Sequence, residues 1–293
     1  MKRWTGFLLL LLLLTACERD VTITPVDAAS KLVVDAEIEN NRPPVILLSK
    51  SLNFFSSIDS AELVRSFVRN ANVTIREGNT VYQMKEFEIR GANGNRVFYY
   101  SNDPANPQQL SGQYGKKYLL TIQVDGQTYT GETTIPLLTK TIDSLWWKKA
   151  PNNEDTTKVV LLGRVTDPPG LGNYIRYFTS VNRQPFLPGL NSVFDDNIID
   201  GKTYEIQIDK GVNRNEEIEF EEYGFFKKGD TATIKLCNID KSTYDFWRTW
   251  EFNFQSIGNP FSSPGKVINN ISNGAVGAFC GYAAQYKSLI IPK

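Results

Sequence analysis

Four oxygen-bearing side chains lie within one short segment, and together they could bind a metal ion. Asp195, Asp196, Asn197 and Asp200 directly precede Gly201. Carboxylate and amide oxygens at this density are typical calcium ligands. Their spacing does not follow the alternating positions of a helix-loop-helix calcium loop, so a solvated loop with a turn at Asp200-Gly201 remains the alternative. Calcium is therefore the one cofactor for which the sequence offers ligands.

The chain contains no histidine. Ser-His-Asp and Cys-His sites therefore cannot form, and the commonest neutral metal ligand is missing. A Gly-x-Ser-x-Gly nucleophile elbow and a phosphate-binding loop are also absent from the sequence. A glycosidase that uses two carboxylates needs no histidine. No two acidic residues can be paired across a cleft from the sequence, so we predict no catalytic residue.

The first residues have the pattern of an exported lipoprotein. Lys2 and Arg3 form a positive start, a leucine-rich run ends at Leu14, and Thr15-Ala16 precede Cys17. The run is too short to span a bilayer, and Leu-Thr-Ala-Cys resembles the bacterial lipobox. We expect residues 1–16 to be a signal peptide and Cys17 to carry acyl chains such as palmitate. Two or more chains make membrane attachment effectively permanent.

Two further features of the sequence limit the chemistry and the partners of the mature protein. Cys237 and Cys280 are the other cysteines, and after export they could form a disulfide or remain two buried free thiols. The chain has 32 basic and 32 acidic residues, so no strong field attracts it to nucleic acid. We expect the membrane as a partner through the N-terminal lipid, and no nucleic-acid partner.

Alternating apolar residues and turn signals predict a mainly β protein. We expect a tether over residues 17–30, then an immunoglobulin-like antiparallel sandwich over residues 31–138. Strict alternation around Asp125-Gly126 predicts a hairpin, and Tyr118, at the start of its strand, resembles the corner tyrosine of such sandwiches. Residues 142–293 are expected to form a second β-rich domain.

The second domain should contain one amphipathic helix near residues 242–256, because aromatic residues recur there at helical spacing. Asp240 or Ser242 could cap it. Residues 186–200 are expected to be a long polar and aromatic loop that presents a binding surface. A run of glutamates over residues 216–222 predicts an edge strand protected by like charge.

Several motifs carry a family resemblance. These are residues 167–174 (DPPGLGNY), 194–202, 229–247, 259–264 (NPFSSP) and 270–277 (NISNGAVG). In this order they resemble the DUF4249 family of Bacteroidota lipoproteins, which has no established activity. Members are often encoded beside TonB-dependent outer-membrane receptors, which implies an accessory role in uptake. In that phylum, acidic residues after the lipidated cysteine resemble a surface-export signal, and Glu18 and Asp20 fit it in part, with Arg19 between them.

Three functions of different classes follow from these observations. The first is a noncatalytic binding or accessory lipoprotein of the outer membrane, exposed at the cell surface rather than facing the periplasm, with a TonB-dependent receptor as partner. The second is a histidine-independent hydrolase such as a two-carboxylate glycosidase. The third is a structural or adhesive surface protein, which predicts flat polar faces without a concave pocket.

Overall fold

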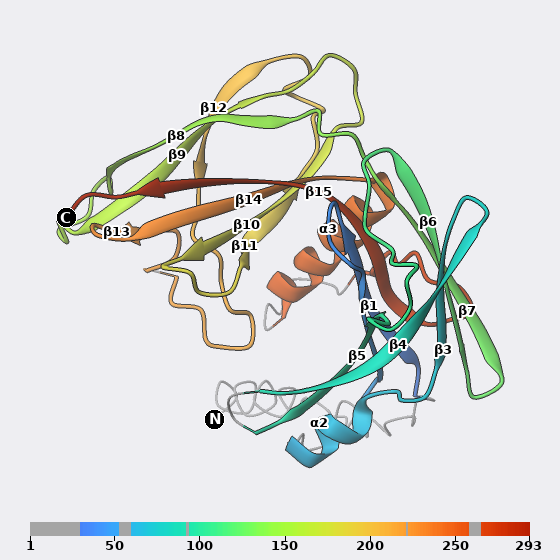
Figure 1. Cartoon of the computed structure of the whole chain (residues 1–293). Coiled ribbons are helices and arrows are strands. Elements are labelled where there is room, and N and C mark those ends of the chain that lie inside the picture. The colour runs from blue at the N-terminus through green and yellow to red at the C-terminus, as the bar shows by residue number, and fades with distance from the viewer. Residues whose placement is uncertain (1–29, 53–59, 92–93, 221, 258–264) are drawn as a thin grey trace, which may run out of the picture.

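The computed structural model describes residues 30–52, 60–91, 94–220, 222–257 and 265–293 (Figure 1). Cys17, the signal peptide at residues 1–16 and the tether up to residue 29 lie outside the described residues. Within the described ranges, no helix combines the length and the apolarity that crossing a bilayer requires. The chain is mainly β, as the sequence predicts.

The N-terminal half contributes seven strands and one short helix. They are β1 (Leu32–Glu39), β2 (Val45–Lys50), α2 (Ser60–Ser66), β3 (Asn72–Glu77), β4 (Thr80–Arg90), β5 (Arg96–Asn102), β6 (Lys116–Val124) and β7 (Gln127–Ile135). In space the strands follow the order β1-β2-β5-β4-β3-β6-β7. Each neighbouring pair is antiparallel.

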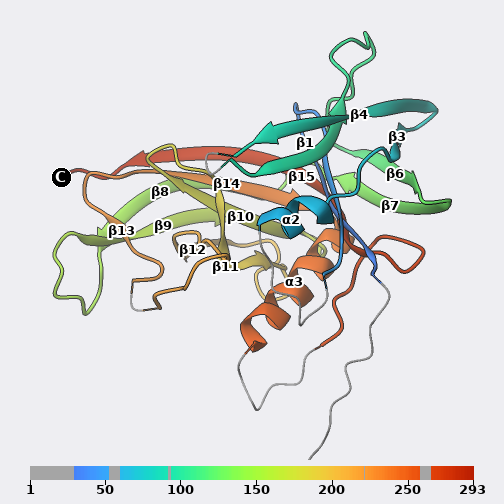
Figure 2. The same ribbon diagram turned by 90° about the horizontal axis from the view of Figure 1, so that it is seen from below.

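The strands of this half enclose one apolar core. Val34 of β1, Ile46 of β2, Ile75 of β3 and Leu120 of β6 are almost fully buried in the same cluster. Strands that are distant in the hydrogen-bonded order therefore face one another, which is the arrangement of a β-sandwich. Figure 2 shows β3, β6 and β7 at the end of the molecule opposite to the C-terminus.

The C-terminal half adds eight strands and one long helix. They are β8 (Thr141–Lys149), β9 (Lys158–Thr166), β10 (Tyr174–Val181), β11 (Leu187–Phe194), β12 (Thr203–Ile208), β13 (Phe226–Lys227), β14 (Thr231–Ile239), α3 (Lys241–Ser256) and β15 (Val276–Ile290). Strands β8, β12 and β13 all pair with β9 in a separate four-stranded sheet. Strands β11, β10, β14 and β15 extend the sheet of the N-terminal half.

The last strand joins the two halves. One part of β15 pairs in parallel with β1, and its remainder pairs antiparallel with β14. Phe279 and Ala283 of β15 belong to the core of the N-terminal half. Close backbone approach requires glycine here, because a Cβ atom on Gly281 would stand 2.6 Å from the carbonyl oxygen of Thr134. The strands on either side of residues 138–142 therefore share one continuous sheet.

Strand β14 has two apolar faces, and each packs against a different layer. Ile234 and Leu236 face the four-stranded sheet, whereas Cys237 and Ile239 face α3. Side chains alternate across a strand, so this pattern requires a layer on each side. Figure 1 shows β8, β9 and β12 on one side of β14 and β15, and α3 on the other.

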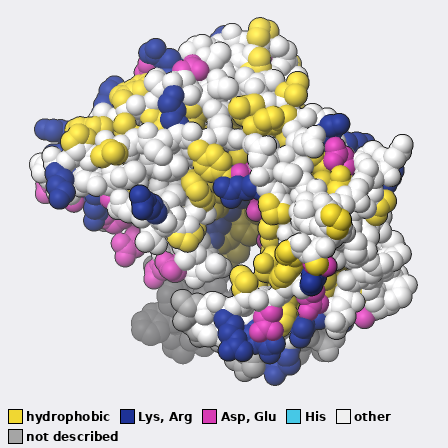
Figure 3. Space-filling model, viewed as in Figure 1, with side chains coloured by type: hydrophobic (Ala, Val, Ile, Leu, Met, Phe, Trp, Pro, Cys, Tyr) yellow, Lys and Arg dark blue, Asp and Glu magenta, His cyan; other side chains and the backbone are white. Residues whose placement is uncertain are grey.

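Basic and acidic side chains intermingle on the face shown in Figure 3.

Two local sequence patterns in the N-terminal half form the structures that they predict. Asp125 and Gly126 both have positive φ angles, 51° and 72°, as a tight hairpin turn requires, and they join β6 to β7. Tyr118 is fully buried, and its hydroxyl oxygen accepts a hydrogen bond of 2.8 Å from the backbone N–H of Gln113. This is the contact of a corner tyrosine.

The predicted helix corresponds to α3, which spans Lys241–Ser256. Asp240 caps it, because one carboxylate oxygen accepts a 2.8 Å hydrogen bond from the backbone N–H of Thr243. The other oxygen binds β7 through the Thr133 hydroxyl and the Thr134 N–H. The cap therefore also anchors the helix to the N-terminal half.

Two predicted segments are different in the structure. Residues 186–200 are not one long loop, because residues 187–194 form β11. Pro188 is tolerated there since β11 is an edge strand. Residues 216–220 form turns and irregular structure, not an edge strand. There the chain turns back on itself, with the N–H of Glu222 bonded to the carbonyl of Glu219.

The two described cysteines are buried and free, so the structure contains the two thiols and not the disulfide between Cys237 and Cys280. Strand register explains why. Cys237 of β14 pairs with Ala284 of β15. Cys280 lies four residues before Ala284 in β15, which displaces it by about 13 Å along the strand. Disulfides require Cα atoms within about 7 Å. Burial raises the pKa of both thiols to about 12.

Candidate functional site

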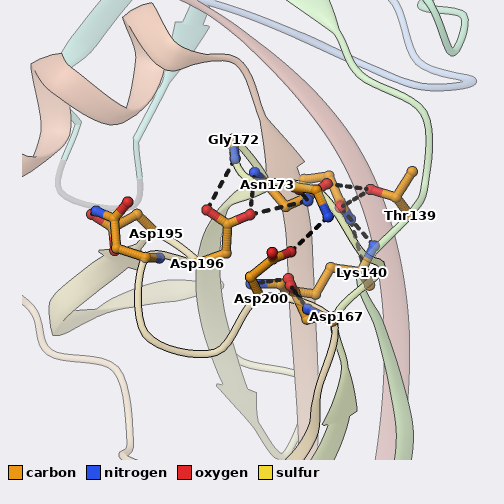
Figure 4. A network of polar contacts seen from close by, with 12 residues as sticks. Thr139, Lys140, Asp167, Gly172, Asn173, Asp195, Asp196 and Asp200 are labelled. Atoms are coloured by element: carbon orange, nitrogen blue, oxygen red, sulfur yellow. Dashed lines mark hydrogen bonds and ion pairs between the residues drawn. The ribbon is translucent and has the colours of Figure 1, made fainter.

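Two loops at one end of the four-stranded sheet carry most of the predicted site residues. The first loop, residues 167–173, links β9 to β10, and the second, residues 195–202, links β11 to β12. Gly170 and Gly172 have φ angles of 110° and 109°, which only glycine adopts without strain. These angles turn backbone N–H groups of the first loop toward carboxylates of the second (Figure 4).

The carboxylate of Asp196 holds the two loops together. Its oxygens accept hydrogen bonds of 3.0 Å from the N–H of Gly172 and 2.9 Å from the N–H of Asn173, and a third from the Asn173 side chain. Burial raises the pKa of Asp196, but these hydrogen bonds from Asn173 and Gly172 outweigh burial and lower it below its usual value. Asp196 is therefore held in its charged form.

Two further aspartates complete the connection between the loops. Asp200 accepts a 2.6 Å hydrogen bond from the N–H of Gly170. In the opposite direction, Asp167 of the first loop accepts one of 3.1 Å from the N–H of Gly201. Carboxylate oxygens of Asp167, Asp196 and Asp200 lie within 4.8 Å of one another. Like charges at this separation repel one another, and a nearby positive charge offsets the repulsion.

Lys140 supplies a positive charge beside this cluster. Its Nζ lies 2.7 Å from an oxygen of Asp167, and both side chains are completely buried. The two atoms are close enough for an ion pair, but they are not oriented for a hydrogen bond. Neither atom has a hydrogen-bond partner among the described residues. Such a pair is costly to break, because removing one partner leaves an uncompensated buried charge.

The predicted calcium ligands are only partly brought together. Asp196 and Asp200 join Asp167, whereas Asp195 and Asn197 lie outside that group. Asn197 donates to Asp195 at 2.8 Å, and the hydroxyl of Tyr244 on α3 donates to the same carboxylate at 2.9 Å. Most oxygens of the cluster already accept backbone N–H groups. Calcium binding at these residues therefore remains a prediction, and Asp167 is the acidic residue that the sequence did not assign.

Beside the second loop, the two sheets border a large cavity that is partly open to solvent. Its volume is about 740 Å³. Its walls are mostly aliphatic side chains of β9, β10, β12 and β14, and the loop closes one side with Asp195, Ile198 and Ile199. The side chains of β12 that point inward are Tyr204, Ile206 and Ile208. These residues alternate along β12, as side chains on one face of a strand do, but the cavity itself was not predicted.

The entrance to the cavity combines exposed apolar groups with tyrosines. Ile198 is 87% exposed and Phe194 is 45% exposed, although both line the cavity. Four tyrosines also line it: Tyr177, Tyr204, Tyr223 and Tyr244. Burial raises the pKa of Tyr204, Tyr223 and Tyr244 to about 12. Their hydroxyls are therefore protonated donors at neutral pH.

Helix α3 fixes one part of this entrance. The ring of Tyr244 stacks on that of Tyr174 with centroids 4.7 Å apart, and its hydroxyl holds Asp195. Elsewhere on the helix, Glu251 is buried and accepts hydrogen bonds from the N–H of Ser192 at 2.9 Å and from Arg214 at 2.8 Å. Strand β11, at Ser192, and the loop after it, at Asp195, are thereby tied to α3.

A sequence model of DUF4249, described as a domain of unknown function, matches residues 18–288. The chain belongs to the DUF4249 family. The match covers both halves of the DUF4249 chain, including the two aspartate loops and the cavity walls. No curated protein matches this DUF4249 sequence.

Proposed function

We propose that this DUF4249 protein is a lipid-anchored outer-membrane protein that binds a small apolar ligand, and that it serves as a noncatalytic accessory component of a TonB-dependent uptake system. The observation that carries the proposal is the cavity of about 740 Å³ between the two sheets. Ligand sites are typically apolar cavities of about 300–1,000 Å³ with a few polar groups. Close-packed protein interiors contain few voids larger than a water molecule.

The membrane part of the proposal rests on the sequence. The lipobox at Cys17 supports acylation, and the acidic residues Glu18 and Asp20 support display at the cell surface. We expect radiolabelled palmitate to enter the protein in its natural host and to be lost in Cys17→Ala. Protease added to intact cells should degrade a surface-exposed protein, and resistance until the outer membrane is broken would indicate the periplasmic face instead.

Binding can be tested without the lipid, because every described helix and strand begins at or after Leu32. The chain from residue 18 onward therefore retains the described fold. The neutral fluorescent probe N-phenyl-1-naphthylamine should bind with a saturable rise in emission. Ile206 lines the cavity and is only partly buried, so Ile206→Trp places a larger ring in the cavity and should weaken binding about tenfold or more. Equal binding by both proteins would place the probe elsewhere and contradict the proposal.

The partner can be tested through an exposed side chain near the cavity. Ile198 is 87% exposed, so Ile198→Asp changes the surface without removing core contacts. Co-purification of a TonB-dependent receptor from outer membranes should fall in this variant. Leu171→Asp is the control, because Leu171 is also exposed, at 68%, and does not line the cavity. Absence of a receptor from purifications of the unaltered lipoprotein would contradict the accessory role.

One observation favours a second function. Asp195 and Asp209 line the same cavity, and a glycosidase needs two carboxylates that face one substrate. Turnover of aryl glycosides that disappears in both Asp195→Asn and Asp209→Asn would replace the binding proposal with a hydrolase. The adhesive alternative predicted faces without a concave pocket, and the cavity does not agree with it.

A further inference from the structure

The cavity is apolar, but the charged groups that line it are all of one sign. Asp195 and Asp209 are its only ionisable residues besides the tyrosines, and no lysine or arginine occurs among the described residues that line it. Aspartate carboxylates are negatively charged at neutral pH. An apolar ligand that enters therefore meets negative charge and no positive charge on the walls.

The hydrogen-bond donors to these two carboxylates are neutral. Asp195 accepts from the Tyr244 hydroxyl at 2.9 Å and from the Asn197 amide at 2.8 Å. Asp209 accepts from the Gln207 amide at 2.9 Å. Neutral donors orient a carboxylate without cancelling its charge. Among the described residues, these donors include no lysine or arginine, so a cationic ligand meets no such competitor at either carboxylate.

Three positive groups around the cavity have other partners or lie outside it, and Lys210, which follows Asp209, is exposed and does not line it. Arg214 pairs with Glu251 at 2.8 Å, and Lys140 pairs with Asp167 at 2.7 Å. Arg248 is exposed on α3, with its guanidinium carbon 5.7 Å from the centre of the Tyr244 ring. None of the three lines the cavity, so none is placed on its walls to bind an anionic ligand.

The aromatic lining agrees with a cationic ligand. Tyr177, Tyr204, Tyr223 and Tyr244 line the cavity together with Phe194. The faces of aromatic rings attract organic cations, and aromatic residues combined with carboxylates are the usual protein environment for an ammonium group. Aliphatic walls meanwhile suit the hydrocarbon part of the same molecule.

We infer that the cavity binds apolar amines, with the hydrocarbon among the aliphatic walls and the ammonium group near Asp195 and Asp209, and that it discriminates against fatty acids of the same length. This inference rests on the proposed binding function and names its ligand class. The hydrocarbon supplies affinity by burial, and the charge supplies discrimination, because an unpaired carboxylate in a low-dielectric cavity repels another.

Three ligands of equal chain length provide the test. Dodecylammonium and dodecanoate, each below its micelle concentration, and dodecanol, below its solubility limit, are titrated against the N-phenyl-1-naphthylamine complex of the chain from residue 18 onward. We expect dodecylammonium to displace the probe at about a tenfold lower concentration than dodecanol, and dodecanoate to be the weakest of the three. Displacement by dodecanoate at an equal or lower concentration than the amine would overturn the inference.

Variants assign the discrimination to the two aspartates. Asp195→Asn and Asp209→Asn should each reduce the preference for the amine over the alcohol. The control is Glu205→Gln, which removes a negative charge from the exposed face of the same strand β12, where Glu205 pairs with Arg164 at 2.9 Å. It should leave the preference unchanged. Loss of preference in Glu205→Gln alone would show a surface effect and contradict the inference.

The outcomes separate the inference from the proposed function. If the probe and all three ligands fail to bind the unaltered protein, the binding function itself is wrong. If the probe and dodecanol bind but charge makes no difference, the cavity is a ligand site and only the amine preference is wrong. The ligand series on the unaltered chain decides this even if an aspartate variant fails to fold.

Discussion

The two halves of the molecule use tyrosine and charge in opposite ways. In the N-terminal half, Tyr100 and Tyr118 are completely buried and their hydroxyls bind the backbone. In the C-terminal half, Tyr204 and Tyr223 are only partly buried and line a cavity. These two tyrosines therefore fill the N-terminal core, whereas Tyr204 and Tyr223 border the cavity of the other half.

Ion pairs show the reverse distribution. Among the described residues, each ion pair within the N-terminal half has an exposed basic side chain, as in Lys117 with Glu132, whose side chains are 63% and 54% exposed. The buried Glu39 of β1 pairs instead with Lys235 of the C-terminal half. The C-terminal half buries the pair Lys140 and Asp167 completely and almost completely buries Glu251 with Arg214. An open cavity contributes little packing of its own, so buried charges and their hydrogen bonds hold the loops that border it.

The largest effect should come from Lys140. Lys140→Met leaves Asp167 buried without its cation and should lower the free energy of unfolding by about 3–5 kcal/mol. Lys117→Met at the exposed pair should cost less than about 1 kcal/mol. Urea denaturation of both variants measures the difference. The double variant Lys140→Met with Asp167→Leu should recover much of the loss, and equal costs at the two lysines would remove the contrast between the halves.

A matched pair of isoleucines tests whether one core is full and the other open. Ile75 is fully buried in the N-terminal core, whereas Ile206 is only partly buried and lines the cavity. Ile75→Trp should lower the free energy of unfolding by about 1–3 kcal/mol through overpacking. Ile206→Trp should change it by less than about 1 kcal/mol while weakening probe binding. A large loss of stability in both variants would mean that the cavity has no room.

The sequence predicts the local features of both halves, but it does not predict the cavity. Alternation places Tyr204, Ile206 and Ile208 on one face of a strand, and Asp125-Gly126 places a hairpin, because both patterns are local. The aromatic spacing locates α3 within a residue at its start. Periodicity says which side of a strand faces inward, but it carries no information about the distance between two sheets. The cavity therefore had no sequence signal.

The site depends on contacts that are distant along the chain. Asp196 and Asp200 were predicted as ligands from the density of oxygen-bearing side chains around them, but their partner Asp167 lies before β10, and Lys140 lies before β8. Only the packing of two loops against each other brings these groups together. The error at β11 has another cause, because Pro188, Gly189 and Asn191 predict a loop, whereas an edge strand accepts them.

Acid should affect the bordering loops through Asp196. Its folded pKa lies below the ordinary value of 3.8, so its contribution to stability is present above that value and is lost as the pH falls through the folded pKa. Asp196→Asn should cost about 1–2 kcal/mol at neutral pH and should flatten the decline in stability below about pH 4. Denaturant midpoints measured at several pH values provide the measurement. An unchanged acid slope would assign the decline to other carboxylates.

The smallest expected effect separates the two kinds of tyrosine directly. Tyr118→Phe removes the acceptor of the Gln113 N–H inside a filled core and should cost about 1 kcal/mol of unfolding free energy. Tyr204→Phe removes a hydroxyl beside open space, where water can take its place, and should change stability by less than about 0.5 kcal/mol. Thermal and urea unfolding of both variants measure the difference. If Tyr204→Phe costs as much stability as Tyr118→Phe, the Tyr204 hydroxyl stabilises the fold. The side chains that line the cavity would then contribute to stability as those of the N-terminal core do.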